Sequence, residues 1–160
     1  MTFSAELEAR FTRLIGCYPA GRERAALIPM LMFAQDEVGS LTPEVVEEIA
    51  GRLKLESHQV DEVISYYSML RRKPAGRHHI QICTNISCLL NGSEELWGHA
   101  CRKLGIGNKE VTPDGEFSLE EVECMGACSW APAVQVGYEF HHEMTVEKLD
   151  RLIDSLRRTN

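Results

Sequence analysis

The sequence predicts an α+β chain, with a bundle of helices over residues 1–73 followed by an α/β sandwich over residues 77–160. Up to about Leu70, apolar residues recur with helical spacing. The stretch 72–76 then interrupts this pattern with a proline and a glycine, which is typical of a linker. Beyond it, short apolar segments alternate with helical stripes, as in a sheet covered by helices.

The first two helices follow from their apolar stripes and stop signals. One face of the first helix carries Leu7, Phe11, Leu14 and Ile15, and this helix is expected to end near Cys17-Tyr18-Pro19. A second apolar stripe covers residues 22–37. Pro29 is expected to kink this helix or to shorten its regular part, and Gly39 to end it.

The third and fourth helices have recognisable starts. Thr42-Pro43 combines a side-chain cap with a proline at the first helical position. Ser57 is expected to cap the fourth helix. The inward stripes are Val45, Val46, Ile49, Ala50 and Leu53 in the third helix, and Val60, Val63, Ile64 and Tyr67 in the fourth.

In residues 77–160 the sequence predicts four strands and two helices. Strands are expected at 79–84, 117–124 and 133–136, with a short fourth at 138–141. Residues 93–104 form a helix between the first two strands, and residues 113–115 form a turn. Thr145 caps a final helix, whose inward residues are Val146, Leu149, Leu152, Ile153 and Leu156. Together these elements make a sandwich of roughly thioredoxin size.

Composition and charge exclude several classes of partner. The chain of 160 residues has a net charge of −7 and no dense basic patch, which disfavours nucleic acid. The longest apolar run, 25–34, is too short to span a bilayer, so any membrane association is expected to be indirect. The N-terminus has no pattern of a secretory signal, so we expect a cytoplasmic protein whose six cysteines are reduced or bind metal.

Four cysteines in two close pairs are the candidate functional residues. Four residues separate Cys83 from Cys88, and three separate Cys124 from Cys128. Cys83 and Cys124 each close a predicted strand, and their partners lie in the loops that follow. If these strands are neighbours, four sulfurs meet at one edge of the domain. This spacing favours a [2Fe–2S] cluster, which takes four cysteine thiolates, over a structural zinc site, two disulfides or thiol chemistry.

The remaining candidates have simpler interpretations. Cys101 lies on the apolar stripe of its helix, and Cys17 lies near a helix end, so both are expected to be structural. His78-His79 and His141-His142 are adjacent on predicted strands and cannot chelate as pairs. Trp97 is expected in the core, and Trp130 either shields the cysteine site or simply packs. Glu120, Glu121 and Glu123 are expected on a solvated face.

Longer motifs give a specific resemblance. They are Ser65-Tyr66-Tyr67-Ser68-Met69-Leu70, Lys73-Pro74-Ala75-Gly76, Ile80 to Asn85 with Cys88, Glu121 to Cys128, and Ala131-Pro132-Ala133-Val134-Gln135-Val136. Over nearly the whole chain these motifs resemble the thioredoxin-like [2Fe–2S] subunit of the NADH-dehydrogenase module of respiratory complex I. In bacteria this family is the E-type subunit of NADH-quinone oxidoreductase.

The resemblance implies a function and a ligand set. Cys83, Cys88, Cys124 and Cys128 would ligate one [2Fe–2S] cluster in a thioredoxin-like domain. The chain would pair with a flavoprotein subunit that binds FMN and NADH, at the cytoplasmic face of the inner membrane, and the helical region would help to dock that partner. The chain alone is not expected to oxidise NADH.

Three alternatives stay open. One is the equivalent subunit of a soluble NAD-linked hydrogenase or formate dehydrogenase. Another is a structural zinc-binding module. The last is a stand-alone ferredoxin, against which the helical region argues.

Overall fold

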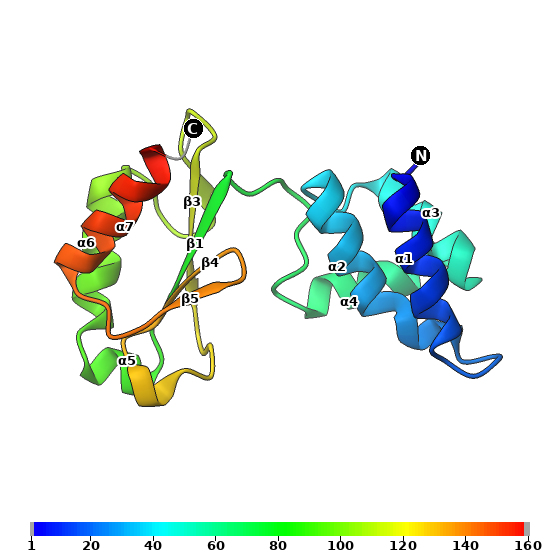
Figure 1. The fold of residues 1–160 in the computed structure, drawn as a ribbon, viewed down its shortest axis with the longest axis horizontal. Helices are drawn as coiled ribbons and strands as arrows, with labels where there is room; N and C mark the ends of the chain where they lie inside the picture. Colours follow the sequence, from blue (N-terminus) through cyan, green and yellow to red (C-terminus); the bar gives the residue numbers. More distant parts are fainter. Residues whose placement is uncertain (1, 159–160) are drawn as a thin grey trace. The chain divides into compact units, whose positions relative to one another are not determined.

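The computed structural model describes residues 2–158 and divides the chain into two compact units at Pro74 and Ala75 (Figure 1). The N-terminal unit is helical. The C-terminal unit contains a sheet with its covering helices. Within residues 2–158, no helix is long and apolar enough to cross a membrane.

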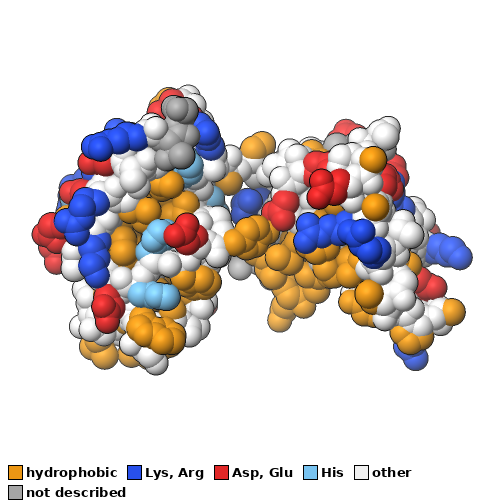
Figure 2. All heavy atoms as spheres, viewed as in Figure 1, with side chains coloured by type: hydrophobic (Ala, Val, Ile, Leu, Met, Phe, Trp, Pro, Cys, Tyr) orange, Lys and Arg blue, Asp and Glu red, His pale blue; other side chains and the backbone are white. Residues whose placement is uncertain are grey.

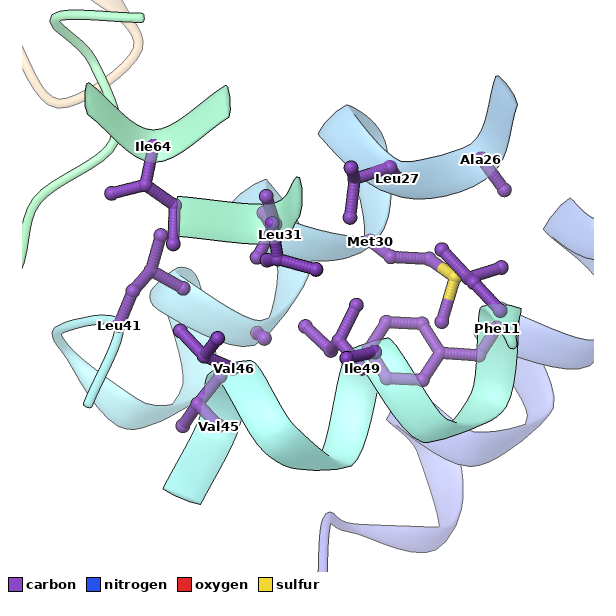
Figure 3. Close-up of a cluster of buried hydrophobic side chains, with 14 of the residues drawn as sticks. Phe11, Ala26, Leu27, Met30, Leu31, Leu41, Val45, Val46, Ile49 and Ile64 are labelled. Carbon is purple, nitrogen blue, oxygen red and sulfur yellow. The ribbon is translucent and has the colours of Figure 1, made fainter. Parts of the chain in front are cut away.

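The N-terminal unit contains four α-helices and one 3₁₀ turn. These are α1 (Ala5–Gly16), η1 (Glu23–Ala26), α2 (Leu27–Val38), α3 (Pro43–Leu53) and α4 (Ser57–Tyr66). Their apolar stripes meet in one core, in which Phe11, Met30 and Ile49 are almost completely buried (Figure 3). The residue after α4, Tyr67, packs against this core as expected. The helical periodicity of the sequence therefore corresponds to real packing faces.

The helix starts differ in detail from those expected. Thr42 precedes α3 in extended conformation, with Pro43 at the first helical position, but its side chain does not cap the helix. Glu56, and not Ser57, caps α4 through a reciprocal capping box with Gln59. Pro29 shortens the second helix: a 3₁₀ turn precedes α2, so the proline falls in the first turn, where no N–H donor is needed.

The C-terminal unit combines a five-stranded sheet with three α-helices. In chain order the elements are β1 (His78–Cys83), α5 (Ile86–Leu90), α6 (Ser93–Leu104), β2 (Glu110–Val111), β3 (Phe117–Val122), η2 (Cys128–Trp130), β4 (Val134–Val136), β5 (Glu139–His141) and α7 (Val146–Arg158). The strand order is β2-β3-β1-β4-β5. β1 and β3 are parallel, and the other pairs are antiparallel.

One face of this sheet is covered by α6 and α7 (Figure 1). Alternate residues of β1, including Ile80 and Ile82, are fully buried with Leu119 of β3 and with Leu149 and Ile153 of α7. Because side chains alternate along a strand, the residues between them point to the other face. The apolar strand positions therefore fix which face the helices cover.

Some elements of this unit differ from the prediction. The helix 93–104 has the expected bounds, and β4 and β5 lie within the expected ranges. β2 and α5 were not predicted, because two strand residues and five helical residues are too short for a periodic pattern. β3 ends at Val122, two residues before the expected end.

Candidate metal centre

The two cysteine motifs leave the same edge of the sheet. β1 and β3 are adjacent and parallel, and their register pairs Cys83 with Val122. Both chains therefore leave the sheet at its carboxyl edge, and each motif continues into the loop beyond. The expected adjacency of these two strands is present.

The structure gives the four thiols different positions from those expected. Cys83 ends β1 and is buried, as is Cys88, but Cys88 lies within the short helix α5 and not in a loop. Cys124 does not close β3, since the strand ends two residues earlier; it lies exposed in the following loop. Cys128 is exposed at the start of η2. All four are free thiols in the structure.

Direct contacts hold the motifs together. Cys83 and Cys88 share a small cluster with Ala127 and Ala133, which lie on either side of η2. The Ser87 hydroxyl of α5 donates a hydrogen bond to the Cys128 carbonyl at 3.0 Å, and α5 and η2 lie side by side (Figure 1). The Cys83 Sγ lies 3.8 Å from the Glu123 carbonyl oxygen, next to Cys124. Both pairs are therefore joined at one edge.

The loop that follows β3 directs a backbone N–H toward the sulfur of Cys124. The Gly126 N–H donates to the Cys124 Sγ at 3.3 Å, and Gly126 has a φ of 74°. A left-handed conformation favours glycine, and it turns this N–H back toward the sulfur. N–H donors to thiolate sulfur stabilise negative charge and tune the reduction potential of iron–sulfur centres.

The electrostatics of the thiols suit a cationic occupant. Burial raises the pKa of the Cys88 thiol, and the neighbouring Cys83 and Cys128 raise it further. A bound metal cation would remove this penalty, because thiolates are its ligands. In the described part of the chain, no group of three or more His, Cys, Asp or Glu side chains is arranged as a metal site. The donor set, four thiols in two pairs, fits a cluster with two irons.

The other two cysteines lie apart from this edge. Cys101 is partly buried on α6 against the sheet core, and burial raises the pKa of its thiol. Cys17 is exposed just beyond α1, where its Sγ donates to the Arg13 carbonyl at 3.3 Å. The contacts of Cys101 are with the sheet core, and that of Cys17 is with α1.

Glu120 is a clear correction to the sequence analysis. It was expected on a solvated face, but it is only 6% exposed. Its carboxylate accepts hydrogen bonds from Gln81 Nε2 and pairs with His79 Nε2, both at 3.0 Å. Burial raises the pKa of the Glu120 carboxyl, but these hydrogen bonds and the nearby Lys109 lower it by more, so the net pKa lies below its usual value. Glu121 and Glu123 are exposed as expected.

The two tryptophans have different environments. Trp97 is partly buried against the sheet core, as expected. Trp130 is 55% exposed, and its ring lies 5.4 Å from that of His142. His141 ends β5 and His142 follows it, outside the strand.

Sequence reasoning missed two residues that support the site. The Asn85 side chain accepts from the Ile86 N–H at 2.8 Å and caps α5. Ser87 then joins α5 to the second motif. The signal was present, because asparagine is a preferred helix cap and directly precedes an apolar segment.

The fold and the paired thiols define an iron–sulfur protein, and comparison with known proteins gives its family. Residues 11–157 match the model of the thioredoxin-like [2Fe–2S] ferredoxins. The chain belongs to this family.

Curated relatives are similar over most of their length. The chain is 44% identical over 157 residues to an E-type subunit of NADH-quinone oxidoreductase from Rhizobium meliloti, covering 98% of this chain and 90% of that protein. It is 44% identical over 141 residues to NADH-quinone oxidoreductase subunit 2 of Thermus thermophilus, covering 88% and 78% respectively.

A solved structure shares the fold. An NAD⁺-reducing [NiFe]-hydrogenase in the H₂-reduced state superposes with a TM-score of 0.74 at 19% identity. The match covers 84% of this chain and 22% of that hydrogenase chain. At this identity the likeness describes the fold alone.

Proposed function

We propose that the chain is the [2Fe–2S] electron-transfer subunit of an NADH-quinone oxidoreductase, with Cys83, Cys88, Cys124 and Cys128 as the cluster ligands. Its relatives at 44% identity are subunits of that oxidoreductase. The partner would be the flavoprotein subunit that holds FMN and NADH, and the helical N-terminal unit would act as a bundle that helps to dock it. The complex would lie at the cytoplasmic face of the membrane.

One observation carries the assignment of the ligands. Two cysteine motifs, about forty residues apart in sequence, leave the same edge of the sheet and are joined there by the Ser87–Cys128 hydrogen bond and the cluster around Cys83 and Cys88. Cys17 and Cys101 lie outside this edge. The four remaining thiols match the number that a [2Fe–2S] centre takes.

Each part of the chain has a distinct task at this edge. The end of β1 and helix α5 hold Cys83 and Cys88 in buried positions, away from water. The Gly126 N–H supports the charge of the Cys124 sulfur. Ala127 and Ala133 pack against Cys83 and Cys88. When bound, a [2Fe–2S] cluster would accept and release one electron at a time.

Hydride transfer is assigned to the partner subunit. In this proposal the partner binds NADH and FMN and carries out hydride transfer, and the four cysteines would hold the cluster that exchanges one electron at a time with the flavin. The chain alone is therefore expected not to oxidise NADH.

The experiment is an anaerobic preparation of the full chain, assayed for iron, zinc and acid-labile sulfide, with EPR before and after dithionite. About two irons and two sulfides per chain, with an S = 1/2 signal on reduction, support the proposal. Zinc without sulfide, from cells able to assemble clusters, would overturn it.

Native co-purification identifies the assembly. A tagged chain is expected to retain an FMN-containing subunit and NADH:quinone activity in detergent extracts. Retention of a hydrogenase or formate dehydrogenase in their place would reassign the chain to a soluble NAD-linked enzyme. Relatives at 44% identity favour the quinone-linked assembly.

A further inference from the structure

A groove between β5 and α7 has no role in the cysteine site. We call it the β5–α7 groove, and it is lined by Phe140, His141, His142, Met144, Lys148, Arg151, Leu152 and Ser155. Its volume is about 590 Å³, within the range of sites that bind ligands or peptide side chains. In Figure 2, histidine and exposed hydrophobic side chains gather in the region over the β4–β5 hairpin and α7.

The groove follows the free edge of the sheet. β5 is the last strand in the order, and its described pairing is with β4 alone. Phe140 and His141 are consecutive in β5, so their side chains point to opposite faces, yet both line the groove. Because β5 is the last strand, the Phe140 N–H and C=O are directed away from β4, and these groups are available to an added strand beside the groove.

The charge of the groove is opposite to that of the whole chain. Lys148 and Arg151 lie three residues apart on α7, on one side of the helix, and no carboxylate is among the eight lining residues. The chain as a whole has a net charge of −7. An anionic segment would therefore be attracted to this groove and repelled by much of the remaining surface.

Neighbouring groups fix the side chains of Lys148 and Arg151 but do not neutralise both of their positive charges. Lys148 Nζ donates to the Glu143 carbonyl at 2.8 Å, which fixes its position and leaves its charge. The Thr145 hydroxyl lowers the pKa of the Glu147 carboxyl, and the nearby Arg151 guanidinium lowers it further. The Glu147 carboxylate is itself held by the Thr145 hydroxyl at 2.7 Å.

Exposed aromatic side chains adjoin the same edge. Phe140 is 42% exposed, and the centre of the His142 ring lies 6.1 Å from that of Phe140 and 5.4 Å from that of Trp130. Exposed rings beside an unpaired strand edge promote non-specific association unless a partner covers them. Here they offer apolar contact for the alternate side chains of an added strand.

We propose that the β5–α7 groove binds an extended acidic segment of a neighbouring subunit, which pairs with the edge of β5 and directs carboxylates to Lys148 and Arg151. β5 has three residues, so the paired part of the segment is short, about 10 Å. The neighbouring subunit is one of the assembly named under the proposed function, and to that extent this inference rests on it. The contact itself does not depend on the cysteines.

The first test measures backbone hydrogen exchange at residues 139–141, in the isolated full chain and in the purified assembly. Strand addition is expected to slow exchange at the Phe140 N–H, which the register directs away from β4, by at least about tenfold, because it gains a hydrogen-bond partner. Equal exchange rates in the two samples would overturn the proposal.

The second test changes the charge of the groove. Lys148→Glu with Arg151→Glu is expected to weaken retention of the chain in the assembly by about tenfold or more at low salt, and by less at high salt. The matched control is Arg102→Glu with Arg158→Glu, which makes the same change of charge at exposed positions outside the groove. Equal retention of both double variants would contradict the proposal.

Two further readouts separate the possible failures. Iron and sulfide content reports the cysteine site, so a chain without a cluster but with slowed β5 exchange would remove the proposed function and keep the groove. If the glutamate pair fails to fold by circular dichroism, Lys148→Gln with Arg151→Gln replaces it. This neutral pair is expected to weaken retention less than the glutamates but more than the control.

Discussion

Cys88 and Cys101 are both on helices and both have a thiol pKa raised by burial, yet their surroundings differ. Cys88 contacts the group around Cys83, whereas Cys101 packs against the sheet core. We therefore expect Cys88→Ser to reduce bound iron from about two per chain to well below one, and Cys101→Ser to leave it unchanged. Iron and sulfide analysis with EPR makes the comparison. Equal loss in the two variants would refute the assignment of the ligands.

Glu120 gives a prediction about pH. Its folded pKa is lowered, because the hydrogen bonds from His79 and Gln81 outweigh its burial. Its contribution to stability is therefore complete above the unfolded pKa, about 4.3, and is lost as pH falls through the lower folded pKa. Glu120→Gln is expected to lower the free energy of unfolding by about 2 kcal/mol at pH 7. Urea titrations at pH 7 and at pH 4 and below should show the difference shrinking in acid.

Glu121 is the matched control for that experiment. It is the next residue of β3 and is exposed. Glu121→Gln is expected to change the free energy of unfolding by less than about 0.5 kcal/mol at either pH. An effect of Glu121→Gln as large as that of Glu120→Gln would mean that general charge, and not the buried contacts, controls acid stability.

At the scale of elements, Gly76 lies just before β1 and approaches the backbone of β3 closely. A Cβ atom added there would lie 2.3 Å from the Phe117 carbonyl carbon, so the backbone of β3 would have to move. Gly76→Ala is expected to destabilise the C-terminal unit by about 3 kcal/mol. Gly51 lies in α3 with no atom within 4 Å of its added Cβ, so Gly51→Ala should stabilise its helix by about 0.5–1 kcal/mol. Thermal unfolding of both variants measures these changes in stability. Destabilisation of similar size in both would contradict the steric argument.

The long elements were predictable because periodicity reports burial. Helix 93–104 has the expected bounds, since its apolar stripe is bounded by Gly92 and Gly105. The short elements were not predictable. α5 has five residues and β2 has two, and each depends on tertiary contacts, such as the pairing of β2 with β3. Local pattern alone therefore placed Cys88 in a loop.

The distinction between local sequence pattern and tertiary contacts also explains which residues of the candidate site were predictable. The two cysteine pairs were visible in the sequence, and so was their position near strand ends. The burial of Glu120 was not visible, because it depends on the register that sets β3 beside His79 and Gln81. Consecutive glutamates at 120 and 121 give the same local signal, although the sheet buries one and exposes the other.

At the scale of the whole molecule, the two units have separate cores. The core of the helical unit draws on residues from Phe3 to Leu70, and the sheet core on residues from Ile80 to Leu156. All four candidate ligands and their supporting residues lie in the second unit. The chemistry of the thiols and the docking role proposed for the helical unit are therefore separable by dividing the chain.

The segment 75–160, expressed alone, is expected to fold and to bind the cluster. Its sheet, its core and both cysteine motifs are complete without residues before Ala75. Iron and sulfide per chain should match the full chain within about a quarter, and the reduced EPR signal should be unchanged, because the ligands and their N–H donors are the same. The segment should fail to retain the flavoprotein, if the helical unit docks it. An aggregated or iron-free segment, in cells where the full chain is loaded, would show that the sheet unit requires the helices. Full retention of the partner would remove the docking role from the helical unit.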